Sequence, residues 1–203
     1  MKRLILVTSP PACGKTYVSK QLARHLKHVV YLDKDTLIVL SKQIFKVANQ
    51  PYDRSSPFFE ENIRNPEYEA IVDLAMEALE YEDMVLINAP FSREVRNVAY
   101  MAALREKLRR KNARLTVIWV QADVEVSRQR MIARKSERDT TKLANWDRYI
   151  KTRDFNIPKT LDDPSVVDDL LIFPNNDEAQ FKTSMQQVLR VIGDADYGNV
   201  ALH

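Results

Sequence analysis

The stretch LILVTSPPACGKT, residues 4–16, decides the fold of this 203-residue chain. Its first part, Leu4 to Val7, is continuously apolar, which is typical of a strand buried on both faces of a sheet. The rest matches the motif G-x-x-x-x-G-K-[ST] at every fixed position except the first, where Ser9 replaces glycine. In such a turn between a strand and a helix, backbone N–H groups converge on phosphate oxygens. The stretch therefore predicts a phosphate-binding loop, the alternative being a chance occurrence of Gly14-Lys15-Thr16 in a turn.

The use of glycine supports this interpretation. The chain has three glycines, and Gly14 is the only one before residue 193, whereas globular proteins average about 7% glycine. Lys15 supplies a mobile cation for the outer phosphates, and the Thr16 hydroxyl is a ligand for Mg²⁺. Cys13 is interpreted as a small loop residue and not as a nucleophile, because a reactive thiol needs a lowered pKa. We expect ATP to be bound by Pro11, Ala12, Cys13, Gly14, Lys15, Thr16 and Tyr17.

The composition excludes several classes of protein. Hydrophobic residues make up 45% and charged residues 29%, as in a globular protein and not in a disordered or fibrous one. A net charge of +3 is too small to indicate a nucleic-acid or membrane surface. One cysteine and three histidines without metal-ligand spacing exclude an intrachain disulfide and a cysteine-rich zinc site. No apolar stretch approaches membrane-spanning length and no signal peptide is visible, so we expect a cytoplasmic protein.

Short apolar runs alternate with amphipathic stretches, which is the pattern of βα units around a parallel sheet. Strands are predicted at 4–8, 29–32, 84–88, 115–121 and 170–173. Helices are predicted at 14–27 and 35–47, from Asn65-Pro66 onward, at 92–111, after Asp123, around Trp146 and Tyr149, and in a last stretch ending near Ile192. The segment 48–65 lacks periodicity and is expected to be irregular. We therefore expect one three-layer α/β domain over residues 1–192, with a five-stranded parallel sheet and a flexible tail at 193–203.

Four further features follow the predicted strands: Asp33-Lys34-Asp35, Asn88, the pair Arg130 and Arg134, and Phe173-Pro174-Asn175-Asn176. Together with the phosphate loop, they make the chain resemble P-loop kinases of the nucleoside-monophosphate-kinase-like group, from about Lys2 to Ile192. Within that group it is most similar to the predicted kinases often labelled AAA-family ATPases, alongside zeta toxins, chloramphenicol phosphotransferase and adenylylsulfate kinase. The resemblance implies a P-loop NTPase fold with a helical lid, here at about residues 134–142.

The resemblance also assigns roles to the carboxylates. Asp35 matches the aspartate that serves zeta toxins and their relatives as the base for the acceptor hydroxyl, and a carboxylate suits that role because it accepts a proton. Asp33, with Thr16, is expected to hold Mg²⁺, chiefly through water. Asn88 stands where the family often has a Walker B aspartate, and its amide cannot neutralise charge. The alternative for Asp35 is that it only caps the second helix.

The same resemblance implies roles for the basic residues and for the asparagines after the last strand. In adenylate-kinase-like enzymes the first arginine of the pair stacks on adenine and the second enters the lid, which implies these roles for Arg130 and Arg134. Arg138 is expected to reach the transferred group from the lid. Asn175 and Asn176 are expected beside the adenine. The alternatives are a solvated basic face for the arginines and a turn that caps the last helix for the asparagines.

The sequence indicates less clearly which residues bind the acceptor, and this part of the site is called the acceptor side below. Arg93 and Arg96 follow the third predicted strand, at the edge of the sheet where ligands of α/β folds bind. The segment 48–65, including Arg64, is expected to cover the acceptor. Arg93 and Arg96 are equally compatible with the start of an exposed helix. The segment 48–65 is alternatively a dimer contact or a plain loop.

The sequence thus favours an ATP- and Mg²⁺-dependent kinase that phosphorylates a hydroxyl of a small molecule. Lys15, Asp35, Arg134 and Arg138 are the expected catalytic residues, and Asp35, Arg64, Arg93 and Arg96 are expected to bind the acceptor. Two alternatives remain open, a nucleotide or polynucleotide 5′-end kinase and a non-catalytic nucleotide-binding protein. A monomer and a homodimer are both compatible with the sequence.

Overall fold

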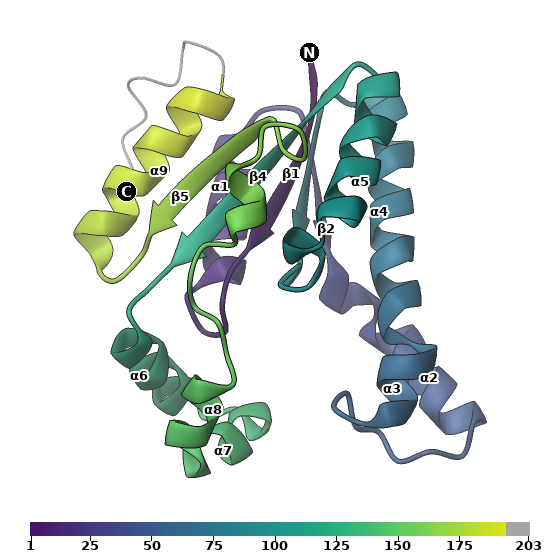
Figure 1. Cartoon of the computed structure of the whole chain (residues 1–203), viewed down its shortest axis with the longest axis vertical. Helices are drawn as coiled ribbons and strands as arrows, with labels where there is room; N and C mark the ends of the chain where they lie inside the picture. The colour runs from purple at the N-terminus through teal and green to yellow at the C-terminus, as the bar shows by residue number, and fades with distance from the viewer. Residues whose placement is uncertain (194–203) are drawn as a thin grey trace.

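The structure, a computed structural model, describes residues 1–193 except for the side chains of residues 137, 138 and 141. Over this part of the chain, a five-stranded sheet has the strand order β2-β3-β1-β4-β5, and every neighbouring pair is parallel (Figure 1). The strands are β1 (Lys2–Thr8), β2 (Val29–Asp33), β3 (Met84–Asn88), β4 (Ala113–Gln121) and β5 (Asp169–Pro174). The parallel five-stranded sheet predicted from the sequence is confirmed. The predicted tail from residue 194 onward lies outside the described residues.

Helices cover both faces of the sheet and make three layers (Figure 1). Helices α1 (Lys15–His25) and α9 (Glu178–Ile192) pack on one face, and α4 (Arg64–Tyr81) and α5 (Val98–Arg110) pack on the other. The remaining helices are α2 (Ile38–Val47), α3 (Pro57–Asn62), α6 (Val124–Arg134), α7 (Glu137–Ala144) and α8 (Trp146–Lys151). Single 3₁₀ turns are formed by Lys34–Leu37, Glu94–Arg96 and Lys159–Asp162. Among residues 1–193, no helix combines the length and the apolar character needed to cross a membrane.

Strand β1 explains why the opening stretch of sequence is continuously apolar. It pairs with β3 on one side and β4 on the other, so it lies at the centre of the sheet. Leu4 and Leu6 enter the core beneath α4 and α5, whereas Ile5 and Val7 enter the core beneath α1 and α9, and all four are fully buried. A central strand covered on both faces needs apolar side chains in both directions.

The segment 48–65 differs from the expected irregular loop, because it contains helix α3. Ser56 accepts a hydrogen bond from the Phe59 N–H, and Pro57 occupies the first turn, so both helix-start signals were present in the sequence. Phe59 and Ile63 pack on Phe45 of α2 in a small apolar cluster of their own. The next helix, α4, begins at Arg64, so Asn65 lies inside its first turn and does not cap it.

Three other helix starts differ in detail from those considered in the sequence. The predicted helix 92–111 is divided, because Asn97 caps α5 by accepting from the Tyr100 N–H at 3.0 Å, after the 3₁₀ turn Glu94–Arg96. The predicted helix 35–47 begins as the 3₁₀ turn Lys34–Leu37 and continues as α2. Helix α9 is capped by Asp177, which accepts from the Gln180 N–H at 2.8 Å, and not by Asn175 or Asn176. Asn97 and Asp177 each offer a side-chain oxygen to the first turn of the helix that follows, whereas α2 has no side-chain cap.

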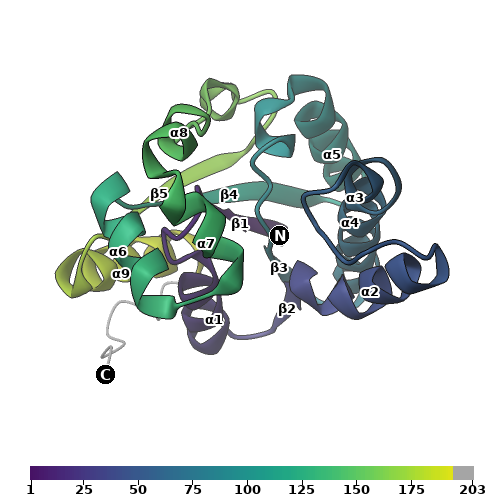
Figure 2. The same cartoon turned by 90° about the horizontal axis from the view of Figure 1, so that it is seen from below.

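The strands end on one side of the molecule, where two groups of helices extend beyond the sheet (Figure 1). Seen from that side, α6, α7 and α8 lie across from α2 and α3 (Figure 2). The expected lid, residues 134–142, corresponds to the end of α6 and most of α7. The expected lid and the segment expected to cover the acceptor thus lie on opposite sides of the carboxyl ends of the strands, where ligands of parallel α/β sheets bind.

Candidate active site

The loop between β1 and α1 has the geometry of a phosphate-binding turn. Gly14 has a φ of 93°, a left-handed conformation that side chains disfavour. Helix α1 begins directly after it, with no side-chain cap and no acidic residue in its first turn. The first N–H groups of a helix have no partners within the helix and carry a partial positive charge. The end of α1 is therefore suited to an anion, as the sequence motif predicts.

Two side chains from the segments that follow β4 and β5 hold this loop. Asn175, after β5, donates from Nδ2 to the Cys13 carbonyl at 2.8 Å. Arg130, on α6, donates from Nη1 to the same carbonyl at 3.3 Å and from Nη2 to the Asn175 carbonyl at 2.8 Å. A Cβ atom built on Gly14 would overlap Asn175 Nδ2. Position 14 thus requires glycine for two independent reasons, the sign of φ and the space that Asn175 occupies.

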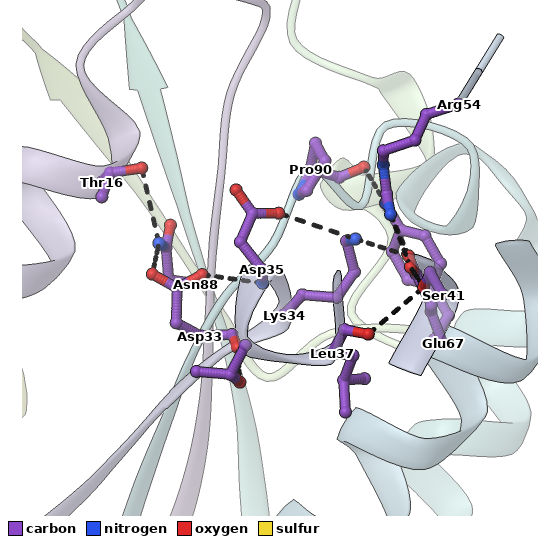
Figure 3. Close-up of polar contacts among 12 residues, drawn as sticks. Thr16, Asp33, Lys34, Asp35, Leu37, Ser41, Arg54, Glu67, Asn88 and Pro90 are labelled. Atoms are coloured by element: carbon purple, nitrogen blue, oxygen red, sulfur yellow. Dashed lines mark hydrogen bonds and ion pairs between the residues drawn. The ribbon is translucent and has the colours of Figure 1, made fainter. Parts of the chain in front are cut away.

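Asn88 connects the phosphate loop to the end of β2. Its Oδ1 accepts from Lys15 Nζ at 2.5 Å, and its Nδ2 donates to Asp33 Oδ2 at 2.9 Å. The same Nδ2 lies 3.4 Å from Thr16 Oγ1 (Figure 3). The Tyr31 hydroxyl donates to Asp33 Oδ2 at 3.0 Å. Burial, followed by the charge of Asp33, raises the pKa of the Tyr31 hydroxyl above its ordinary value.

The donors around Asn88 fit Mg²⁺. The Thr16 hydroxyl and the Asp33 carboxylate both contact the Asn88 amide, so two oxygen donors converge beside the phosphate loop. Mg²⁺ prefers oxygen ligands and keeps several waters, and so it needs few protein ligands when phosphates are present. The oxygen donors of Thr16 and Asp33 therefore fit Mg²⁺.

Asp35 lies on the 3₁₀ turn after β2 and faces open space. Its side chain is 58% exposed, while its backbone N–H donates to Asp33 Oδ1 at 3.0 Å. Asp33 therefore caps the turn, and the carboxylate of Asp35 is not used for capping. The Lys34 ammonium lies 3.8 Å from Asp35 Oδ1 (Figure 3).

The phosphate loop and Asp35 line the same cavity, which has a volume of about 920 Å³. Among the side chains that the structure describes, two carboxylates line it, those of Asp35 and Asp154, against a much larger set of basic side chains. These are Lys15, Lys34, Arg54, Arg64, Arg93, Arg96, Arg130, Arg134, Lys142 and Arg153. Such a surplus of cations in a concave site concentrates anions there.

The cavity wall contains most of the residues singled out in the sequence. Pro11, Ala12, Gly14, Lys15, Thr16 and Tyr17 line it on the loop side. Cys13, Asn175 and Asn176 do not belong to the described lining: Cys13 and Asn175 are buried beneath the loop, and Asn176 Oδ1 accepts from the Asp123 N–H at 2.7 Å. These three residues therefore contact the protein rather than the cavity.

The lid contributes Arg134 and Lys142 to the cavity wall. Both form ion pairs with Asp139, whose side chain is 1% exposed, and the Lys142–Asp139 distance is 3.1 Å. Burial alone would raise the pKa of Asp139, but the hydrogen bonds from Arg134 and Lys142 outweigh it and lower that pKa. The Arg138 side chain, expected at the same site, lies outside the described residues.

The three arginines expected on the acceptor side all line the cavity, and each pairs with one carboxylate. Arg64 contacts Glu94 at 2.7 Å, Arg93 contacts Glu60 at 2.6 Å, and Arg96 contacts Asp154 at 3.1 Å. Lys34, in the Asp33-Lys34-Asp35 stretch, and Lys142, in the expected lid, line the wall without having been predicted as site residues. Sequence reasoning also missed Trp119, Thr152, Arg153 and Asp154. These residues come from elements far apart in the sequence, and no local motif marks them.

A family model described as an AAA domain matches residues 4–155. The chain belongs to this AAA-domain family. The match includes the phosphate loop, Asp35, Asn88 and the pair Arg130 and Arg134. None of the curated protein sequences is significantly similar to the chain.

Solved structures of kinases share the fold of this AAA-domain chain. A sugar kinase from a Janibacter species is 11% identical, with a TM-score of 0.61 over 98% of this chain and 100% of that one. Shikimate kinase from Bacteroides thetaiotaomicron is 18% identical, with a TM-score of 0.51 over 94% and 98%. Kti12 from Chaetomium thermophilum, in complex with ADP-AlF3, is 20% identical, with a TM-score of 0.55 over 94% and 99%. The predicted P-loop kinase fold is confirmed.

Proposed function

We propose that the protein transfers the γ-phosphoryl group of ATP to a hydroxyl of a small molecule, with Mg²⁺. The observation that carries this proposal is the cavity of about 920 Å³ that the phosphate loop and the exposed Asp35 carboxylate share. A phosphate-binding loop alone suits any nucleotide-binding protein, whereas a carboxylate opposite it suits phosphoryl transfer to a hydroxyl. The fold shared with the sugar kinase and shikimate kinase supports the same reaction class.

The proposed step uses the residues of the wall as follows. Lys15 and the loop N–H groups hold the β- and γ-phosphates, while the acceptor hydroxyl lies between Asp35 and the γ-phosphorus. The hydroxyl oxygen forms a bond to that phosphorus, the bond from phosphorus to the β–γ bridging oxygen breaks, and ADP leaves. The hydroxyl proton passes to Asp35 and then to water. Arg134 and Arg138 of the lid stabilise the charge on the transferred group.

Thr16 and Asp33 are the residues that would hold Mg²⁺, and the ion would neutralise negative charge on the bound phosphates. Asn88 orients this pair through its hydrogen bonds and holds Lys15 on its other side. Arg130 and Asn175 act by fixing the loop carbonyl of Cys13. Most of the rate gain is then expected from positioning and charge stabilisation.

The test is ADP formation from Mg-ATP with a panel of sugars, sugar acids, aminoglycosides, nucleosides, nucleotides and short oligonucleotides. Asp35→Asn should retain ATP affinity and lose at least about 10²-fold of the turnover, because general acid–base catalysis contributes about that much. Asp163→Asn is the matched control, since that exposed aspartate contacts only its own turn. Turnover that survives in Asp35→Asn would contradict the role of Asp35. ATP binding without turnover on any acceptor would favour a non-catalytic nucleotide-binding protein.

A further inference from the structure

Glu67, on α4, is the centre of a buried ionic cluster beside Asp35. Its carboxylate accepts from Lys34 Nζ at 2.8 Å and from Arg54 Nη1 and Nη2 at 2.6 and 2.7 Å. The Ser41 hydroxyl donates to it as well (Figure 3). The cluster joins α4, α2, the turn that carries Asp35, and the segment between α2 and α3.

The charges in this cluster do not balance. Two cations, Lys34 and Arg54, share the single carboxylate of Glu67, whose side chain is 4% exposed. Burial would raise the pKa of Glu67, but the hydrogen bonds from Arg54, Lys34 and Ser41 outweigh it and lower that pKa to about 2. The carboxylate is therefore ionised at neutral pH, and the buried part of the cluster has one more cation than carboxylates. The next carboxylate is that of the exposed Asp35, 3.8 Å from Lys34 Nζ.

This excess distinguishes the cluster from the other basic groups of the acceptor side. Arg64, Arg93 and Arg96 each have a carboxylate of their own. A cation that is already neutralised attracts a further anion weakly, whereas a buried cluster with net positive charge attracts one strongly because water screens it little.

Both cations also line the cavity, and their bonds to Glu67 use only part of their N–H donors. Lys34 and Arg54 line the cavity wall, although the Lys34 side chain is only 3% exposed. An ammonium has three N–H donors and a guanidinium five, and the bonds to Glu67 use one and two of these. The Arg54 guanidinium lies 4.4 Å from the centre of the Phe59 ring, a contact that fixes its plane.

We propose that Lys34 and Arg54 form a subsite for an anionic group on the acceptor, a carboxylate or a phosphoryl group, and that Glu67 is the positioning residue of this subsite. This inference rests on the proposed function, because it names the substrate class of the same site. Lys34 Nζ lies 3.8 Å from Asp35 Oδ1, so an anion held by Lys34 places the rest of the acceptor next to the proposed base. A hydroxyl a few bonds away from the anionic group then reaches Asp35.

The experiment measures anion binding without catalysis. The protein is saturated with Mg²⁺ and the β,γ-imido analogue of ATP, which fills the phosphate loop up to the γ-phosphate. Inorganic phosphate and, separately, malonate are then titrated in a calorimeter. We expect Lys34→Met and Arg54→Gln each to raise the Kd of the bound anion about tenfold, the effect of losing one charge-assisted hydrogen bond. Arg54→Lys keeps the charge but loses the paired N–H donors of the guanidinium, so its Kd should lie between those of wild type and Arg54→Gln.

Lys111→Met and Arg110→Gln are the matched controls, because these residues pair with Glu80 and Glu106 on the surface. Their Kd values should equal that of the wild type. Binding of phosphate but not malonate would assign a phosphorylated acceptor, and binding of malonate an acidic one with a carboxylate. If Lys34→Met fails to fold, the Kd of Arg54→Gln alone tests the subsite. The Arg54 side chain is 27% exposed, so its replacement disturbs the fold less.

Two outcomes would overturn the inference: equal Kd values in the wild type, Lys34→Met and Arg54→Gln, or no anion bound by the saturated wild type. The acceptor panel reports on the proposed function separately. If no acceptor of the panel is phosphorylated, the kinase activity is contradicted, while the Kd values for phosphate and malonate still test the subsite. If only neutral acceptors are phosphorylated and the anion Kd is the same in wild type and variants, only the subsite is contradicted.

Discussion

The amide of Asn88 bonds Lys15 with its oxygen and Asp33 with its nitrogen, at 2.5 and 2.9 Å. This relationship joins the cation of the phosphate loop to the carboxylate at the end of β2. A carboxylate at position 88 would still accept from Lys15, but it would present an oxygen to Asp33 where the amide presents a donor. An amide therefore satisfies both neighbours at once, which explains how a site without a carboxylate at the end of β3 stays ordered.

Asn88→Asp should destabilise the protein when metal is absent. The substitution removes a buried donor and sets two carboxylates side by side, which costs about 1–3 kcal/mol of the free energy of unfolding. Urea unfolding in the presence of a chelator measures this loss, and added Mg²⁺ should restore part of it, because a cation can then bind between the carboxylates. Asn97→Asp is the control, since aspartate caps α5 as well as asparagine does. Equal stability of Asn88→Asp and wild type in chelator would contradict the prediction.

Gly14→Ala should weaken both stability and nucleotide binding. Alanine at a φ of 93° costs about 1–2 kcal/mol, and its Cβ would also overlap Asn175 Nδ2. Adding Asn175→Ala removes the overlap but not the backbone strain, so the double variant should recover part of the unfolding free energy. The measurements are chemical unfolding and the Kd of Mg-ADP.

A control for Gly14→Ala lies two residues away. Ala12 has a φ of 62°, so Ala12→Gly relieves strain and should leave the free energy of unfolding unchanged or slightly raised. If Gly14→Ala and Ala12→Gly behaved alike, the conformational argument for Gly14 would be wrong.

Glu67 should make the stability of the protein depend on pH in the acid range. The folded-state pKa of about 2 lies below the ordinary value of 4.5, so the stabilisation is complete above pH 4.5 and disappears as the pH falls toward 2. The shift corresponds to about 3 kcal/mol for this buried carboxylate. The difference in unfolding free energy between wild type and Glu67→Gln should therefore be large at pH 6 and shrink below pH 4.5. Urea unfolding from pH 3 to 7 measures it.

Glu106→Gln provides the contrast. Pairing with Arg109 and Arg110 lowers the pKa of Glu106 to about 2 as well, but this carboxylate lies at the surface, where ion pairs contribute little. We expect little change of stability in Glu106→Gln. A larger loss there than in Glu67→Gln would show that burial does not decide the effect.

The sequence predicted the parts of the structure whose signals are local. The apolar run 4–7, Gly14 and the helix behind it lie within one stretch of chain, so the strand and the turn were visible directly. Helix α3 was missed although Ser56 and Pro57 are good start signals, because the surrounding polar residues obscured its short apolar face. The cluster around Glu67 was not predictable at all. Lys34 and Glu67 are separated by 33 residues, and only the packing of α4 against the turn after β2 brings them together.

The Cys13 thiol should be inert in the native protein. Burial raises its pKa above the ordinary value, and hydrogen bonding to Ser127 and the charge of Arg130 only partly oppose this effect. The side chain is fully buried beneath the phosphate loop. Because the thiolate is the reactive form, both its low population and its burial slow alkylation.

Iodoacetamide labelling at pH 8 tests this directly, since Cys13 is the single cysteine of the chain. The rate in native protein should be at least about tenfold below that in urea-unfolded protein, a lower bound set by the raised pKa and the burial together. Arg130→Lys keeps a positive charge near the loop but loses the paired guanidinium hydrogen bonds to the carbonyls of Cys13 and Asn175. If these hydrogen bonds keep the loop closed, the substitution should speed labelling. Equal rates in native and unfolded wild-type protein would show that the thiol is accessible, and the interpretation of Cys13 as a structural loop residue would then be wrong.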